Sequence, residues 1–144
     1  NAGNYFISKW TDATTHTNYP PVIRCAEVLL NRAEALVRAG GTLTQGAVDL
    51  LNAVRTRSFA TGAYTLASFA TAADFYTAIL NERSMEFLGE GIRNMDIMRL
   101  GLTIPAKNGG TMGNVLAVAP TSPSYIWPIP TTELILNKLM TPNE

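Results

Sequence analysis

Apolar side chains recur at helical spacing through the first part of the chain. From Val22 to Ala39 they form a single stripe, which Gly40 and Gly41 bring to an end. A second stripe follows Thr44, a suitable N-cap residue, and it consists of Ala47, Leu50, Leu51 and Val54. A short link between two amphipathic helices predicts an antiparallel helical hairpin. The hairpin resembles a tetratricopeptide unit, although its spacing matches that consensus loosely and no second copy follows.

Two further helices are predicted after the hairpin. Thr71 and Asp74 have the spacing of a capping box at the start of a third helix, which we expect over about 72–88. A fourth, shorter helix should lie between Gly91 and Gly101. Glycine between the two helices permits a sharp change of direction.

The last part of the chain lacks helical periodicity until near its end. Residues 102–124 are rich in Gly, Pro, Thr and Asn, which predicts a long irregular loop. The apolar, proline-punctuated run over 125–130 predicts an extended segment laid into the core, with Trp127 as a core residue. Residues 131–136 should form a last helical turn or two. The predicted fold class is therefore mainly α: a tetratricopeptide-like hairpin, further helices and long irregular loops.

Carboxylates lie where the third helix should be buried. Glu82 and Glu86 fall on the same helical stripe as Phe75 and Ile79. A buried carboxylate is costly unless it is paired, and arginines follow at matching offsets. We therefore expect a structural ion network, whose predicted members are Glu82, Arg83, Glu86, Glu90, Arg93, Asp96 and Arg99.

The length of 144 residues suits one domain with a sizeable core. We expect residues 1–144 to form that domain, with an extended arm (1–19), a helical core (20–101), a loop (102–124) and a closing segment (125–144).

Charge and cysteine content exclude several classes of protein. The chain has 11 basic and 11 acidic residues, so no basic surface favours nucleic acid or an anionic membrane. The single cysteine, Cys25, excludes an internal disulfide and is predicted to be a small buried hydrophobe. No apolar run is long enough to span a bilayer.

Four blocks of sequence occur in a distinctive order. They are residues 22–36, residues 51–57, the charged stretch 82–99, and Ile126-Trp127-Pro128-Ile129-Pro130 followed by Glu133 and Asn137. These blocks cover most of residues 20–143, and they resemble the C-terminal region of the SusD/RagB family. The chain departs from the family where aromatic residues are common, at Cys25, Gly89, Asn94 and Leu100. Because the family's larger N-terminal part is absent, we expect a piece of a longer protein.

The resemblance implies a function in nutrient uptake. It implies a surface-exposed outer-membrane lipoprotein that captures glycans or other nutrients and works with a SusC-like TonB-dependent transporter. The lipid-bearing cysteine would lie far upstream, and Cys25 is not that anchor. Neither an enzymatic activity, a cofactor nor a metal is implied. The alternative is a helical protein-interaction module without a ligand of its own.

Two aromatic residues are candidates for stacking against a sugar ring. Tyr64 lies in a Gly/Ala/Thr-rich loop, and Trp10 lies in the arm beside Lys9. For each, packing inside the fold is the commoner explanation. No cluster of aromatic and convergent polar residues is evident, so we expect this chain alone to bind glycans weakly or not at all.

Catalytic and metal-binding interpretations are weaker. Glu82 and Glu86 lie one helical turn apart, near the carboxyl separation of about 5–5.5 Å that a retaining glycosidase needs. The structural network, however, accounts for every charge in the stretch. His16 has no Cys or carboxylate at ligand spacing and is expected to be solvated.

Overall fold

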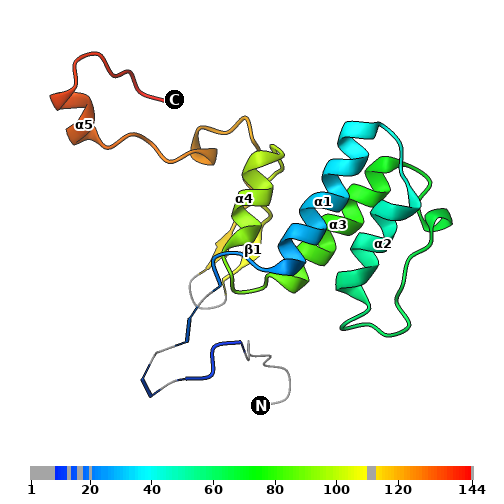
Figure 1. The fold of residues 1–144 in the computed structure, drawn as a ribbon. Helices are drawn as coiled ribbons and strands as arrows, with labels where there is room; N and C mark the ends of the chain where they lie inside the picture. The colour runs from blue at the N-terminus through cyan, green and yellow to red at the C-terminus, as the bar shows by residue number, and fades with distance from the viewer. Residues whose placement is uncertain (1–8, 13, 16–17, 20, 110–112, 144) are drawn as a thin grey trace. The chain divides into compact units, whose positions relative to one another are not determined.

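The described part of the chain is mainly helical (Figure 1), which confirms the predicted fold class. The computed structural model describes residues 9–12, 14–15, 18–19, 21–109 and 113–143. The chain divides into two compact units, a helical unit that extends to Arg93 and a C-terminal unit that starts at Asn94. That residues 1–144 form a single domain stays a prediction.

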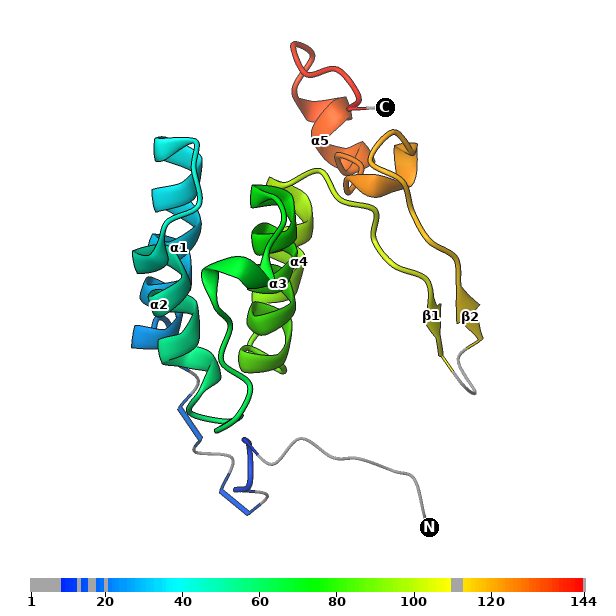
Figure 2. The same cartoon turned by 90° about the vertical axis from the view of Figure 1, so that its right-hand side faces the viewer.

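Three helices build the helical unit: α1 (Cys25–Gly40), α2 (Gln45–Arg55) and α3 (Ala72–Glu86). The predicted hairpin is confirmed, because α1 and α2 lie side by side and are joined by a short link (Figures 1 and 2). Helix α1 also packs against α3, and a short 3-10 helix, η1 (Leu66–Ser68), lies in the link before α3. The three helices therefore share one core.

Most of the core of the helical unit comes from the stripes expected from the sequence, although Leu50 is only partly buried and Val48, outside the expected stripe, is buried. The buried apolar side chains of this core are Ala26, Leu30, Ala33 and Val37 of α1, Ala47, Val48, Leu51 and Val54 of α2, Phe75 and Ile79 of α3, and Phe87. Two expectations at the start of α1 are wrong, since Val22 is 97% exposed and Cys25 is exposed as well. The helix begins only at Cys25, after Arg24, whose backbone is extended.

Local side-chain caps explain where α2 and α3 begin. The Thr44 hydroxyl accepts a hydrogen bond from the Ala47 N–H, as predicted. At the start of α3 the capping box is confirmed. The Thr71 N–H donates to Asp74 at 2.8 Å, and the Asp74 N–H donates to the Thr71 hydroxyl at 3.2 Å.

A glycine-rich turn follows α3, which ends at Glu86 rather than at Leu88. Gly89 and Gly91 have φ angles of 81° and 79°, a left-handed conformation that glycine adopts without strain. Helix α4 (Ile92–Arg99) begins after this turn. We call residues 86–91 the corner, because the backbone changes direction there.

The C-terminal unit contains more regular structure than expected. Strands β1 (Lys107–Asn108) and β2 (Asn114–Val115) pair in antiparallel orientation, and an isolated bridge joins Ile104 to Val118. The loop expected over 102–124 therefore carries two strands of two residues each and one bridge, which the sequence did not indicate. The 3-10 helix η3 (Pro123–Tyr125) and helix α5 (Thr131–Leu136) follow, and α5 confirms the last predicted helix.

The closing segment is only partly buried. The Tyr125 side chain is buried, and its hydroxyl donates to the Leu102 carbonyl at 2.8 Å. The next two residues contradict the prediction of a segment laid into the core, because Ile126 is exposed and Trp127 is 88% exposed. In the described residues, no helix is both long and apolar enough to cross a membrane.

Candidate functional site

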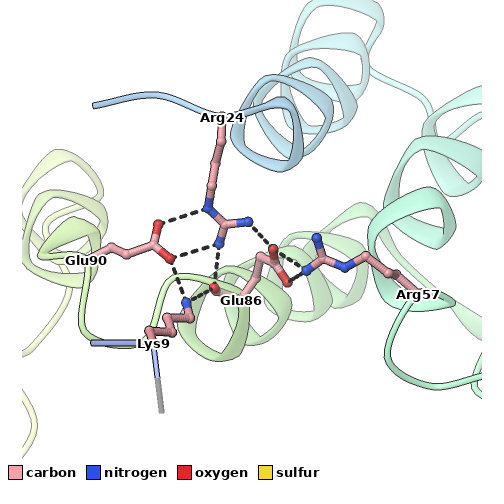
Figure 3. A network of polar contacts seen from close by, with 5 residues as sticks. All are labelled: Lys9, Arg24, Arg57, Glu86 and Glu90. Carbon is pink, nitrogen blue, oxygen red and sulfur yellow. Dashed lines mark hydrogen bonds and ion pairs between the residues drawn. The ribbon is translucent and has the colours of Figure 1, made fainter. Parts of the chain in front are cut away.

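A network of charged side chains surrounds the corner of the helical unit (Figure 3). Its carboxylates are Glu86, the last residue of α3, and Glu90, in the turn; their side chains are 7% and 6% exposed. Three cations from three separate segments reach them: Lys9 of the arm, Arg24 before α1 and Arg57 after α2. We call these five residues the corner network.

Arg24 is the centre of the corner network. Its Nε and Nη2 atoms donate to the two carboxylate oxygens of Glu90, each at 3.0 Å. Its Nη1 donates to the Glu86 carboxylate, and Nη2 also donates to the Glu86 carbonyl oxygen at 2.6 Å. The guanidinium lies over the Phe87 ring, 4.7 Å from its centroid. One planar fork thus joins the start of α1 to the end of α3.

The charges in the network stabilise one another. Burial raises the pKa of Glu86, but hydrogen bonds and charge from Arg24 and Arg57 outweigh this effect and lower it overall. The pKa of Glu90 is lowered in the same way, by Arg24 and Lys9 against the effect of burial. Burial works to lower the pKa of Arg24, but Glu90 and Glu86 raise it overall. Both carboxylates are therefore held ionised.

The remaining predicted members form other contacts. Glu82 pairs with Arg55 of α2 at 2.9 Å, and Arg83 donates to the Asn31 side chain at 2.6 Å. In the C-terminal unit Arg99 pairs with Asp96 at 3.0 Å.

The structure does not support the prediction that Arg93 belongs to the ion network. Its side chain is exposed, and it takes part in none of the ion pairs among the described residues. It lies within α4, past the corner, whereas the cations that reach the corner carboxylates come from the arm, from the residue before α1 and from the segment after α2. The partners that the sequence did not reveal are Lys9, Arg24, Arg55 and Arg57, which all lie outside the charged stretch 82–99.

Tyr64 is built into the packing of the helical unit. The Arg55 guanidinium lies 4.6 Å from the Tyr64 ring centroid, and the Phe69 ring lies 5.0 Å from it. The Asn52 side chain binds both the N–H and the carbonyl of Tyr64, at 2.8 Å each. Much of the ring is therefore already covered.

The other aromatic candidates are more accessible. Trp10 is 37% exposed, and none of the contacts among the described residues joins it to Tyr64. Trp127 is more exposed than either, so sequence analysis missed the most accessible tryptophan. Its position inside an apolar, proline-flanked run gave no signal that could have revealed this.

Two open hollows lie in the C-terminal unit, with volumes of about 280 and about 300 Å³. The first is lined by Pro120, Thr121, Ser122, Pro123, Ile126 and Asn143. The second lies along β1 and β2. Neither is lined by an aromatic ring, so neither offers a stacking surface for a sugar.

Comparison with known proteins identifies the family. The model of the SusD family matches residues 1–144. This chain belongs to the SusD family. It is 32% identical to the starch-binding protein SusD of Bacteroides thetaiotaomicron, over 96% of this chain and 25% of that protein. A crystal structure of a SusD superfamily protein from Bacteroides fragilis shares 39% identity and a TM-score of 0.73, over 92% of this chain and 30% of that one.

The SusD assignment confirms the resemblance found in the four sequence blocks. It also shows how much of a SusD protein is present, since the chain spans about a quarter of the length of its curated relative. The larger part of such a protein lies outside these 144 residues.

The carboxylates of this SusD chain are poorly suited to acid catalysis. A glycosidase needs a carboxyl group whose pKa is raised, so that it can protonate the leaving group. The pKa of Glu86 is lowered instead, and both Glu82 and Glu86 are paired with arginines. The geometry favours a structural role for this pair.

No group of three or more His, Cys, Asp or Glu side chains suited to a metal ion occurs within the described ranges. His16, expected to be solvated, lies outside the described residues.

Proposed function

We propose that this SusD-family chain belongs to a nutrient-binding component of an outer-membrane uptake system, that the nutrient is a glycan, and that the component is not an enzyme. The observation that carries the proposal is the match of the SusD family model along the whole chain. Identity of 32% to a protein named for starch binding supports a glycan as the ligand. The ionised, arginine-paired carboxylates support binding without hydrolysis.

Trp10 and Tyr64 are the proposed contacts to the ligand within this chain. A sugar site needs an aromatic face for apolar contact and polar groups that fix orientation. Trp10 has free surface, whereas Tyr64 is engaged by Arg55 and Phe69, so Trp10 is the stronger candidate. Since the chain spans a quarter of its relative, we expect a complete site to need residues beyond these 144.

Titration calorimetry tests this proposal. The 144-residue chain and a polypeptide of SusD length that contains it are titrated with the same panel, linear α-glucan oligosaccharides first and unrelated glycans second. We expect the longer polypeptide to bind and the short chain to bind weakly or not at all. Failure of the longer polypeptide to bind any member of the panel would overturn the assignment of a glycan ligand.

Substitution in the longer polypeptide tests the two aromatic residues. Trp10→Ala is expected to weaken glycan affinity more than Tyr64→Ala, and Tyr64→Ala should mainly lower stability. Equal, wild-type affinity for both variants would place the stacking surface elsewhere. If the short chain binds as tightly as the longer one, a complete site lies within residues 1–144.

A SusC-like TonB-dependent transporter is the proposed partner, and a lipid anchor upstream is the proposed attachment to the outer membrane. The support is the family membership. Co-purification of the transporter with an affinity-tagged longer polypeptide tests the partnership, and protease treatment of intact cells tests surface exposure. Protection from protease on intact cells would contradict the location.

A helical protein-interaction module is the second candidate. Exposed apolar side chains in the C-terminal unit favour it, since large exposed apolar patches mark contact surfaces. The most exposed are Leu139, Trp127 and Leu116. Partner binding that is lost in Trp127→Ala, without glycan binding by the longer polypeptide, would favour this candidate over the first.

A further inference from the structure

Lys9 ties the arm to the corner through two contacts. Its Nζ donates to the Glu86 carbonyl oxygen and to the Glu90 carboxylate, both at 2.6 Å (Figure 3). These acceptors lie 77 and 81 residues further along the chain. The Lys9 side chain is itself 37% exposed. A single ammonium group at the surface therefore connects the arm to the end of α3.

The Glu86 carbonyl is a strong acceptor for a cation. The last carbonyls of a helix have no partner within the helix, and they form the negative end of the helix dipole. Glu86 is the last residue of α3. The Glu90 carboxylate beside this carbonyl adds a full negative charge, so the corner presents two converging acceptors to Lys9.

Departure of Lys9 would leave both carboxylates paired. Glu90 keeps its two bonds to Arg24, and Glu86 keeps Arg24 and Arg57. Loss of Arg24 would weaken the pairing of both carboxylates, because the Arg24 side chain is bonded to Glu86 and to Glu90. Stranding a buried charge costs several kcal/mol, whereas removing an additional cation does not strand one. Lys9 can thus leave with little effect on the helices.

Trp10 follows Lys9 directly and would move with it. The Trp10 side chain is 37% exposed, so most of its surface lies against protein. We propose that Lys9 is a latch: its ammonium group, docked at the corner, holds Lys9 and the adjacent Trp10 at the helical unit, and its undocking frees Trp10 while α1, α2 and α3 stay folded. Because Lys9 is partly exposed, dissolved salt weakens the latch.

Limited proteolysis with chymotrypsin measures the release. If the proposal is right, cleavage of the peptide bond between Trp10 and Thr11 requires undocking of Lys9, and mass spectrometry identifies the product. Lys9→Met removes the ammonium group but keeps a long apolar side chain. Lys138→Met is the matched control, since Lys138 is exposed in the C-terminal unit. Each rate is divided by the rate for a short arm peptide with the same sequence, which corrects for the preference of the protease.

We expect Lys9→Met to be cleaved roughly tenfold faster than the wild type, the order of change that one hydrogen bond to a charged group produces in an opening equilibrium. Lys138→Met should match the wild type, and thermal unfolding of Lys9→Met followed by circular dichroism should stay close to that of the wild type. Raising NaCl from about 0.05 to about 1 M should speed cleavage of the wild type but not of Lys9→Met.

Trp10 fluorescence gives an independent measurement in the Trp127→Phe background, where Trp10 is the remaining tryptophan. Lys9→Met should increase quenching by acrylamide. The proposal is overturned if Lys9→Met leaves cleavage and quenching unchanged, or if salt affects it as much as the wild type. It is also overturned if Lys9→Met unfolds the helices as readily as Arg24→Ala, because Lys9 would then be an ordinary member of the network.

Discussion

Replacement of Arg24 by alanine should destabilise the helical unit more than replacement of any exposed residue of α1, the helix that follows it. The substitution removes two 3.0 Å bonds to Glu90, the pair with the Glu86 carboxylate and the 2.6 Å bond to the Glu86 carbonyl. It also removes the guanidinium that lies over Phe87. Both carboxylates are more than nine-tenths buried and would each lose their main partner.

The expected loss can be estimated from these contacts. Removing one partner of a buried ion pair costs about 3–5 kcal/mol. The Arg24 side chain is 24% exposed, and Glu86 and Glu90 would keep Arg57 and Lys9, which places the value at the lower end. We therefore expect Arg24→Ala to lower the free energy of unfolding by about 3 kcal/mol.

Urea unfolding followed by far-ultraviolet circular dichroism measures this change. Arg32→Ala is the matched control, because Arg32 is an exposed arginine on the same helix, and it should change stability by less than about 0.5 kcal/mol. Arg24→Lys keeps the charge but loses the planar fork, and it should fall between the two. Equal stability of Arg24→Ala and Arg32→Ala would refute the reasoning, because the corner carboxylates would then be solvated.

Four further outcomes follow from the described contacts. Folding lowers the pKa of Glu86 below its ordinary value of 4.5. The ionised Glu86 therefore contributes its full stabilisation above pH 4.5, and this contribution is lost as the pH falls through the lower pKa of the folded state. Denaturation midpoints measured across this acid range should fall less steeply in Glu86→Gln than in the wild type. Glu82→Gln should lower the melting temperature yet leave the glycan affinity of the longer polypeptide unchanged by calorimetry, and a selective loss of affinity would revive a functional carboxylate. Ile79→Ala, at a fully buried position, should cost about 2–5 kcal/mol in urea unfolding. Thr71→Ala should cost about 1 kcal/mol through the lost cap, and an unchanged midpoint would contradict the role of that cap.

Features that depend on neighbouring residues could be predicted from the sequence. The cap at Thr44 and the capping box at Thr71 require residues only three positions apart, and both are present. The hairpin was predictable because both of its stripes have helical spacing and the link is short. The caps and the stripes are both formed by residues close together in the sequence, so they could be predicted without knowledge of the tertiary structure.

The partners of the corner carboxylates could not be predicted in this way. A carboxylate on a buried stripe indicates that a cation must be near, but it does not indicate which one. Arg24 lies 62 residues from Glu86, and Arg57 lies 29 residues from it. Arg93 lies close in sequence to Glu90, yet it is exposed and forms no ion pair among the described residues. Proximity along the chain was therefore the wrong criterion.

The exposure of the aromatic side chains could not be predicted from the sequence either. Tyr64, in a Gly/Ala/Thr-rich loop, is packed between Arg55 and Phe69, whereas Trp127, in an apolar run, is exposed. The difference arises from contacts with segments distant in sequence, and no local pattern records them. The candidate ligand residues therefore stay proposals that need binding measurements.

Two errors of prediction have a common cause: the predicted helix α1 started too early, and Arg24 was not recognised as a partner of Glu86. The apolar stripe was extended back to Val22, which placed Arg24 inside the helix, on its polar face. In the structure Arg24 has an extended backbone, with φ −143° and ψ 161°, and the helix begins at the next residue. A residue at this position has left the helical spiral, so its side chain can cross to another helix rather than lie along its own. Val22 is exposed for the same reason, because it lies before the helix and has no stripe to join. The extended backbone of Arg24 and its contact with the corner therefore occur together at the start of α1, and the local apolar pattern records neither of them, because Glu86 lies 62 residues away.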